Sequence, residues 1–138
     1  MCFVELKKHD TPLLKEVATA YRTKCWVIDD ELTGGMIQVQ QTIEGAVRDR
    51  TEKVEVDDKN GNPTNNALFV HRPKGFLVVG NKNEFKSEHG PNIYKLGSFE
   101  LFRRNTTSPE VITYDELYDR AKHIVEHSEI DGQQADAN

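Results

Sequence analysis

The feature that most constrains the fold is a short, wholly apolar run near the middle of the chain, Phe76-Leu77-Val78-Val79, followed by Gly80. A strand with one face in solvent would carry a polar residue at every second position. An uninterrupted apolar run instead indicates a strand buried on both faces. The sequence therefore predicts an α/β fold in which residues 76–80 form the centre of the sheet.

The first residues of the chain predict a second strand, with a different pattern. Apolar and charged residues alternate over residues 3–8, so that side chains divide between two faces: Cys2, Val4 and Leu6 on one, and Phe3, Glu5 and Lys7 on the other. A carboxylate and an amine thus share one face near the end of a strand. In α/β folds, binding sites gather at that end of the sheet.

A Glu-x-Lys pair of this kind suits hydrolysis of a phosphodiester. The Glu5 carboxylate would hold a divalent metal ion, and the Lys7 ammonium would orient a water molecule and offset charge on the phosphate. The simpler interpretation, which three residues alone favour, is an edge strand with a solvated face.

The clearest predicted helix begins at Asp29 and Asp30 and continues to Arg50. Its apolar stripe follows spacings of three and four: Leu32, Met36, Val39, Ile43, Ala46 and Val47. A second stripe is small and polar: Glu31, Gly34, Gly35, Gln38, Thr42 and Gly45. Because glycine is costly inside a helix, something must approach it closely. We favour the sheet, and a substrate strand facing Glu31 and Gln38 is the alternative.

The other segments predict short elements. We expect a helix over Leu13–Ala20, extended or irregular chain over Tyr21–Ile28, an exposed loop over Glu55–Pro63 and a strand over Ala67–Val70. Further along the chain we expect a helix carrying Leu96, Phe99 and Phe102, and a strand at Val111–Thr113. A capping box of Thr113 and Glu116 predicts a last helix, whose apolar face is Leu117, Ala121, Ile124 and Val125. Residues 128–138 are acidic and poor in apolar groups, which predicts a disordered tail after a domain of residues 1–127.

Together these elements predict a small mixed sheet flanked by helices. The 138 residues suit one domain. The apolar runs are too short for a membrane span and no signal peptide is evident, so we expect a cytoplasmic protein without membrane contact. Two cysteines, Cys2 and Cys25, exclude a disulfide framework or a four-cysteine zinc site and fit a reducing compartment.

The net charge of −5 is unevenly distributed. Residues 1–24 and 67–109 carry net charges of +2 and +4, whereas residues 25–66 and 110–138 carry −5 and −6. The basic segments contain the Glu-x-Lys strand and a basic turn with His71, Arg72 and Lys74, which could contact phosphate or simply be solvated. This distribution permits a nucleic-acid partner without requiring one.

Several stretches, taken in order, resemble one family from about Cys2 to Val125. The stretches are Val4–Lys8, Asp10–Leu14, Tyr21–Arg22, Glu31–Gly34 with Gln38, Pro73–Gly80, Phe99–Arg103 and Ile112–Leu117. They resemble the nuclease domain of the Shedu antiphage-defence proteins, a branch of the PD-(D/E)xK nuclease superfamily. The resemblance implies a restriction-endonuclease-like core and a metal-dependent DNA endonuclease that hydrolyses phosphodiesters with metal-activated water.

The resemblance also implies roles for particular residues. Glu5 and the backbone carbonyl of Leu6 would bind Mg²⁺ or Mn²⁺, Lys7 would be the catalytic lysine, and Gln38 would lie near the site. Lys8, Arg72 and Lys74 are the expected DNA contacts. The family usually places such a domain after a variable N-terminal region and assembles it into oligomers.

Two positions depart from the superfamily pattern. No aspartate strand precedes Glu-x-Lys, and Thr42 stands where a helix tyrosine often follows the glutamine. Because Mg²⁺ usually takes one or two carboxylates, three explanations are open: an N-terminally truncated core, a second carboxylate with Glu31 as first choice, or a catalytically silent domain. We favour the first and third over the second.

The first strand would also be an edge with unpaired backbone groups if nothing preceded it. We therefore expect a homo-oligomer. The alternative function is a catalytically silent domain of the same fold that binds DNA or assembles oligomers.

Overall fold

A three-stranded parallel sheet lies at the centre of the protein. The computed structural model describes residues 1–17, 22–49, 53–69 and 73–135. Strands β1 (Cys2–Leu6), β6 (Lys74–Val78) and β9 (Glu110–Ile112) pair in the order β1-β6-β9, with Glu5 opposite Leu77 and Leu77 opposite Val111. The apolar run predicted to form the sheet centre is therefore the middle strand, with Leu77 and Val79 fully buried.

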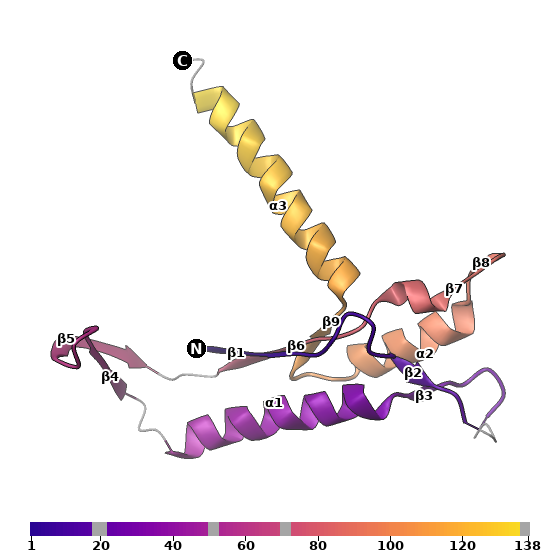
Figure 1. Cartoon of the computed structure of the whole chain (residues 1–138), viewed down its shortest axis with the longest axis horizontal. Coiled ribbons are helices and arrows are strands. Elements are labelled where there is room, and N and C mark those ends of the chain that lie inside the picture. Colours follow the sequence, from indigo (N-terminus) through magenta and orange to yellow (C-terminus); the bar gives the residue numbers. More distant parts are fainter. Residues whose placement is uncertain (18–21, 50–52, 70–72, 136–138) are drawn as a thin grey trace.

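Helix α1 (Asp30–Asp49) connects β1 to β6 and covers one face of this sheet (Figure 1). Its predicted start is confirmed, because the Asp29 carboxylate accepts a hydrogen bond from the N–H of Glu31 at 2.8 Å. The approach to the sheet is close at Gly75, where a Cβ would lie 2.6 Å from Ile43 Cδ1 and 2.7 Å from Val39 Cγ1. Only glycine leaves room there for the helix.

Two further helices follow β6. Helix α2 (Ile93–Arg104) is capped by Asn92, whose side chain accepts hydrogen bonds from the N–H groups of Tyr94 and Lys95. Helix α3 (Tyr114–Ala135) leaves the sheet on the side opposite α1 (Figure 1). The core between the sheet, α1 and α2 contains Leu13, Leu14, Leu32, Met36, Leu77, Val79, Phe85, Phe99 and Val111.

The capping box of α3 is half formed. The Thr113 N–H donates to Glu116 Oε2 at 3.2 Å, but the buried Thr113 hydroxyl has no hydrogen-bond partner among the described residues. The predicted apolar face of this helix is exposed, as Leu117 and Ile124 illustrate. The helix continues through residues 128–135 of the segment 128–138, where composition predicts disorder, and residues 136–138 lie outside the described residues. The domain boundary at residue 127 stays a prediction.

The sequence predicts a single mixed sheet. The structure instead has the three-stranded parallel sheet and, separate from it, small antiparallel pairs of strands. These are β2 (Leu14–Lys15) with β3 (Val27–Ile28), β4 (Lys53–Asp57) with β5 (Pro63–Phe69), and β7 (Lys86–Ser87) with β8 (Gly90–Pro91). A 3-10 turn, η1 (Lys82–Phe85), follows β6. Over the described residues the fold is thus α/β, with several small sheets and three helices.

Two local predictions were wrong. The helix expected at Leu13 is absent over the described residues 13–17, because Leu14 and Lys15 pair with Ile28 and Val27 as strands β2 and β3. The backbone N–H groups of Leu13 and Leu14 also donate to the Glu84 carboxylate at 2.8 and 3.2 Å. Burial raises the pKa of Glu84, and these two bonds partly offset that effect. Residues 18–20 of the predicted helix lie outside the described residues.

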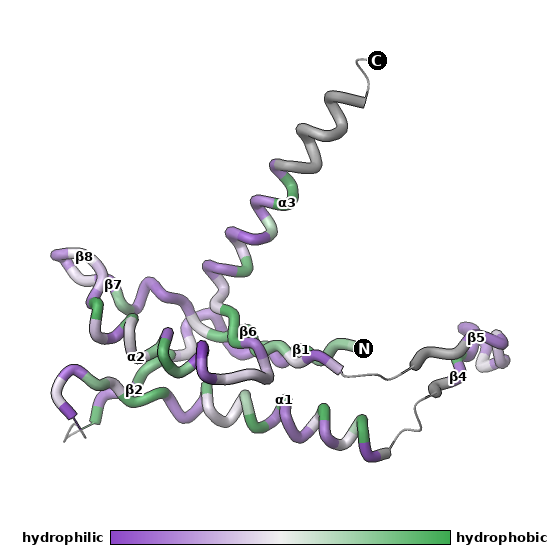
Figure 2. The backbone as a smooth tube through the Cα atoms, turned by 180° about the vertical axis from the view of Figure 1, so that it is seen from behind, coloured by the Kyte–Doolittle hydropathy of each residue, from purple (hydrophilic) through white to green (hydrophobic). Residues whose placement is uncertain are grey.

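The predicted loop at Glu55–Pro63 is instead a hairpin whose turn comprises only residues 58–62. The Asp58 carboxylate holds the turn by accepting hydrogen bonds from the N–H groups of Asn62 and Asn60, and these bonds lower its pKa. The hairpin tip is hydrophilic (Figure 2). The strand expected over Ala67–Val70 is confirmed for residues 67–69, the end of β5, and Val70 lies outside the described residues. None of the described helices is long and apolar enough to cross a membrane.

Candidate functional site

The side chain of Lys7 is the centre of a polar cluster between β1 and α1. Its Nζ donates a hydrogen bond to Gln38 Oε1 at 2.9 Å. The same nitrogen lies 3.6 Å from Glu5 Oε1 and 3.8 Å from Glu31 Oε2. The structure therefore brings together four residues that the sequence analysis singled out, from two elements far apart in the chain.

The strand and the helix each place two of these residues by simple periodicity. Glu5 and Lys7 share a face of β1 because strand side chains alternate, and that face points toward α1. Glu31 and Gln38 are seven residues apart on α1, close to two full turns, so they lie on one side of the helix. The cluster lies at the carboxyl end of β1, where sites of α/β folds are usually found.

Gly35 makes room for Lys7 beneath the helix. A Cβ at this position would lie 3.1 Å from Lys7 Cε and 3.0 Å from Leu77 Cδ1, which is tighter than ordinary contact. The favoured interpretation of the glycine stripe, close approach to the sheet, is thus confirmed for Gly35. For Gly34 and Gly45 a Cβ would meet nothing within 4 Å.

The cluster is half open to solvent. The Lys7 side chain is 19% exposed, whereas that of Glu31 is 69% exposed. An exposed ion pair contributes little to stability, so the Glu31 contact does not by itself hold the fold together. Its exposed carboxylate is accessible to a ligand.

The backbone at Lys7 is fixed from two directions. The Lys7 N–H donates to Val78 O at 2.9 Å, and the Tyr114 hydroxyl donates to Lys7 O at 2.6 Å. Successive residues of a strand turn their backbone groups to opposite sides, so the carbonyl of Leu6 faces the open edge of the sheet. Sequence reasoning missed Tyr114, because its contact with Lys7 spans 107 positions and no local pattern signals it.

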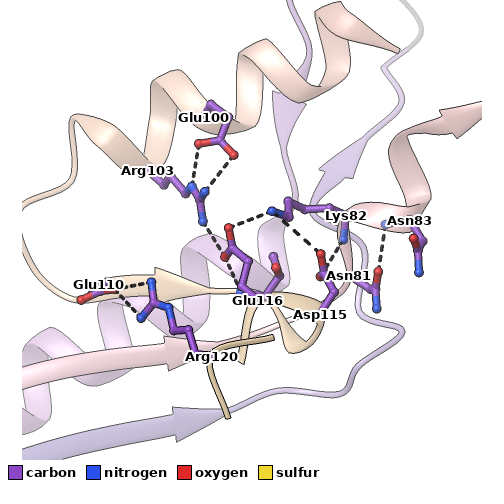
Figure 3. Close-up of polar contacts among 10 residues, drawn as sticks. Asn81, Lys82, Asn83, Glu100, Arg103, Glu110, Asp115, Glu116 and Arg120 are labelled. Atoms are coloured by element: carbon purple, nitrogen blue, oxygen red, sulfur yellow. Dashed lines mark hydrogen bonds and ion pairs between the residues drawn. The ribbon is translucent and has the colours of Figure 1, made fainter. Parts of the chain in front are cut away.

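A network of charges holds the start of α3, and hence Tyr114, in place (Figure 3). Arg103 donates to Glu116 Oε2 at 2.7 Å and also pairs with Glu100 at 2.8 Å, while Lys82 Nζ donates to Glu116 Oε1 at 2.9 Å. Partial burial alone would raise the pKa of Glu116, but the bonds from Arg103, Lys82 and the Thr113 N–H outweigh it and lower the pKa to about 2. The carboxylate is therefore charged at neutral pH, and its bond raises the pKa of Arg103.

The expected metal ligands are all oxygen donors. Glu5 and Glu31 supply two carboxylates within 4 Å of one ammonium, and the Leu6 carbonyl faces the open edge beside them. Hard oxygen ligands of this kind suit Mg²⁺ or Mn²⁺, which often takes only one or two carboxylates from the protein. No group of three or more His, Cys, Asp or Glu side chains that could hold a metal occurs among the described residues.

The expected DNA contacts are separated. Lys8 is exposed and follows Lys7 directly in the chain. Lys74 is also exposed, but it pairs in register with Cys2, at the opposite end of β1 from Lys7. Five residues of strand correspond to about 16 Å, so Lys74 is not part of the cluster. Arg72 lies outside the described residues.

Comparison with known proteins identifies one family. A family model described as Shedu protein SduA, C-terminal, matches residues 1–118. The match includes β1, α1, the central sheet, α2 and the first turn of α3. No curated protein matches the chain closely enough to serve as a relative.

Proposed function

Since the chain belongs to the Shedu SduA C-terminal family, a membership that supports a role in an antiphage-defence protein, we propose that it is a metal-dependent DNA endonuclease domain of the PD-(D/E)xK type. The observation that carries the proposal is the contact of the Lys7 ammonium with Glu5, Glu31 and Gln38. A lysine beside two carboxylates at the carboxyl end of a strand of the parallel sheet has the composition that phosphodiester hydrolysis needs.

In this proposal Glu5, Glu31 and the Leu6 carbonyl hold Mg²⁺ or Mn²⁺. When bound, the ion supplies positive charge against the phosphate and makes water a better nucleophile. Glu31 then takes the place of the aspartate expected upstream of Glu-x-Lys. The distance of 3.8 Å between Glu31 Oε2 and Lys7 Nζ supports Glu31 as the second carboxylate. The sequence alone favoured a truncated core or a catalytically silent domain over this explanation.

Lys7 has two roles in the proposed reaction. Its ammonium orients the attacking water and offsets charge that develops on the phosphate oxygens. Gln38 accepts a hydrogen bond from Lys7 Nζ and so limits the positions that the ammonium can take. Lys8, which is exposed and follows Lys7 in the chain, binds the phosphate backbone of the DNA in this proposal.

The test is cleavage of supercoiled and linear DNA by the full 138-residue chain with Mg²⁺ or Mn²⁺. We expect cutting that is lost in Glu5→Gln and Lys7→Ala. Glu44→Gln is the matched control, because Glu44 is an exposed glutamate on α1 two turns beyond Gln38. Cutting that survives in both site variants would overturn the proposal, as would the absence of metal-dependent cutting by the folded wild-type chain.

A second candidate function is a domain of the same fold that binds DNA or assembles oligomers without cutting. It is favoured by the outer face of β1, where Val4 and Leu6 are exposed beside an open strand edge. Pairing of this edge with a second copy would satisfy its backbone groups and cover the apolar side chains. Sedimentation at several protein concentrations distinguishes a monomer from a homo-oligomer. A monomer at every concentration would contradict the homo-oligomer. A cytoplasmic location also stays a prediction.

A further inference from the structure

A second site candidate lies away from the Lys7 cluster, between the segment Arg22–Ile28 and helix α2. A groove of about 610 Å³ opens there, lined by Arg22, Lys24, Trp26, Tyr94, Gly97 and Leu101 among others. A volume of this size is typical of ligand sites. No acidic side chain is among the lining residues, although the chain as a whole carries a net charge of −5.

Two aromatic rings in the groove are each paired with a lysine. Lys24 Nζ lies 4.7 Å from the centroid of the Tyr94 ring, and Lys95 Nζ lies 4.2 Å from the centroid of the Trp26 ring. Lys24 reaches this position from a left-handed backbone conformation, with φ of 66°. Of these four residues, Lys24, Trp26 and Tyr94 line the groove together with Arg22, so that two cations and two aromatic rings share its lining.

Gly97 leaves the middle of the groove open. It lies inside α2, where glycine weakens a helix relative to alanine. Nevertheless, a Cβ at Gly97 would meet nothing within 4 Å, so packing within the described chain does not require glycine. Ile93 and Leu101, on the same groove, are exposed as well. The groove therefore presents exposed apolar surface beside its aromatic rings.

We infer that this groove binds single-stranded nucleic acid, with bases stacked on Tyr94 and Trp26 and phosphates paired with Arg22 and Lys24. Aromatic rings interleaved with cations are the usual platform for single strands, since every base presents a π face. A duplex keeps its bases stacked inside the helix, where these rings cannot reach them. The inference deepens the proposed function and rests on it for the choice of ligand, because charge complementarity alone would also admit an acidic peptide.

The single tryptophan gives a direct reading of binding, since Trp26 is the only one in the chain. Titration of the full chain with oligothymidylate in EDTA, which prevents metal-dependent cutting, is expected to quench its fluorescence. A duplex of equal length is expected to quench it much less. Tyr94→Ala should raise the dissociation constant by about tenfold, as removal of one stacking ring typically does.

Gly97→Leu tests the groove without changing the charge. The leucine side chain fills the open space, so binding should weaken by at least about tenfold, while the melting temperature does not fall. Gly45→Leu is the matched control, because a Cβ at Gly45 also meets nothing within 4 Å, on α1. It should leave binding unchanged.

Three results would overturn the inference. They are equal quenching by duplex and single strand, unchanged binding by Gly97→Leu, and quenching by polyglutamate but not by the oligonucleotide. Lys7→Ala separates this inference from the proposed function: it should abolish cutting and leave quenching by the oligonucleotide unchanged. If Gly97→Leu cuts DNA normally and also binds the oligonucleotide as tightly as wild type, the inference about the groove is refuted and the proposed nuclease function stands.

Discussion

The hydrogen bond from Tyr114 to the backbone of Lys7 provides the sharpest single-atom test of how the site is positioned. Tyr114→Phe removes the hydroxyl that donates to Lys7 O at 2.6 Å and leaves the ring in place. The ring also packs edge-on against His9, at 6.4 Å between centroids, and this contact survives the substitution. The variant therefore loses one hydrogen bond and little else.

The cost of that loss follows from ordinary hydrogen-bond energetics. Removal of one partner of a partly buried bond costs about 1 kcal/mol in net stability. For a domain of this size the melting temperature should fall by about 3 °C. A free energy of about 1 kcal/mol also corresponds to about a fivefold loss in rate if the bond is needed to align Lys7 in the transition state.

The assay pairs thermal unfolding with metal-dependent DNA cleavage at saturating DNA. Tyr118→Phe is the matched control, since Tyr118 is one turn further along α3 and 68% exposed. We expect it to match wild type in both measurements. A Tyr114→Phe variant that loses stability but keeps the full cleavage rate would show that the bond supports the fold and does not position Lys7. No change in either measurement would refute the bond itself.

Two further predictions concern stability. Gly75→Ala should destabilise the fold by about 1–3 kcal/mol in urea unfolding, because its Cβ would lie 2.6 Å from Ile43 Cδ1. Gly45→Ala, where the Cβ points into open space, should instead stabilise the fold by up to about 1 kcal/mol. Equal urea midpoints for the two variants would refute the close contact at Gly75. The pKa of Glu116 is lowered from 4.5 to about 2, so its contribution is fully present above pH 4.5 and is lost as the pH falls toward 2. This shift in the pKa of Glu116 corresponds to at most about 3 kcal/mol of folding free energy. The difference in stability between wild type and Glu116→Gln should therefore shrink between pH 5 and 2, about the range of the two pKa values. A difference that stays constant over this range would contradict the lowered pKa of Glu116.

The parts of the fold that the sequence predicts are those set by local periodicity. Alternation in β1 assigns Glu5 and Lys7 to one face, the spacing of three and four gives α1, and the apolar run gives the central strand β6. These patterns depend on neighbours within one or two turns, so they can be read without tertiary structure.

The missed features depend on contacts between distant parts of the chain. Leu14 and Lys15 pair with Ile28 and Val27, and this pairing forms a strand where local pattern predicts a helix. Glu84 accepts hydrogen bonds from the N–H groups of Leu13 and Leu14, about 70 positions away. Tyr114 reaches Lys7 across 107 positions. The helix face of Glu31 made it a candidate from sequence. Its distance to Lys7 could not be predicted, because that distance depends on how α1 is positioned along β1.

The most direct test of the central claim, that β1 and α1 together form one metal site, is Mn²⁺ binding to the full chain measured by electron paramagnetic resonance. The wild type and Glu44→Gln are expected to bind one Mn²⁺ with equal affinity. Glu5→Gln and Glu31→Gln are each expected to lose that binding, because each removes one of the two carboxylates beside Lys7. Binding that persists unchanged in both variants would contradict the account.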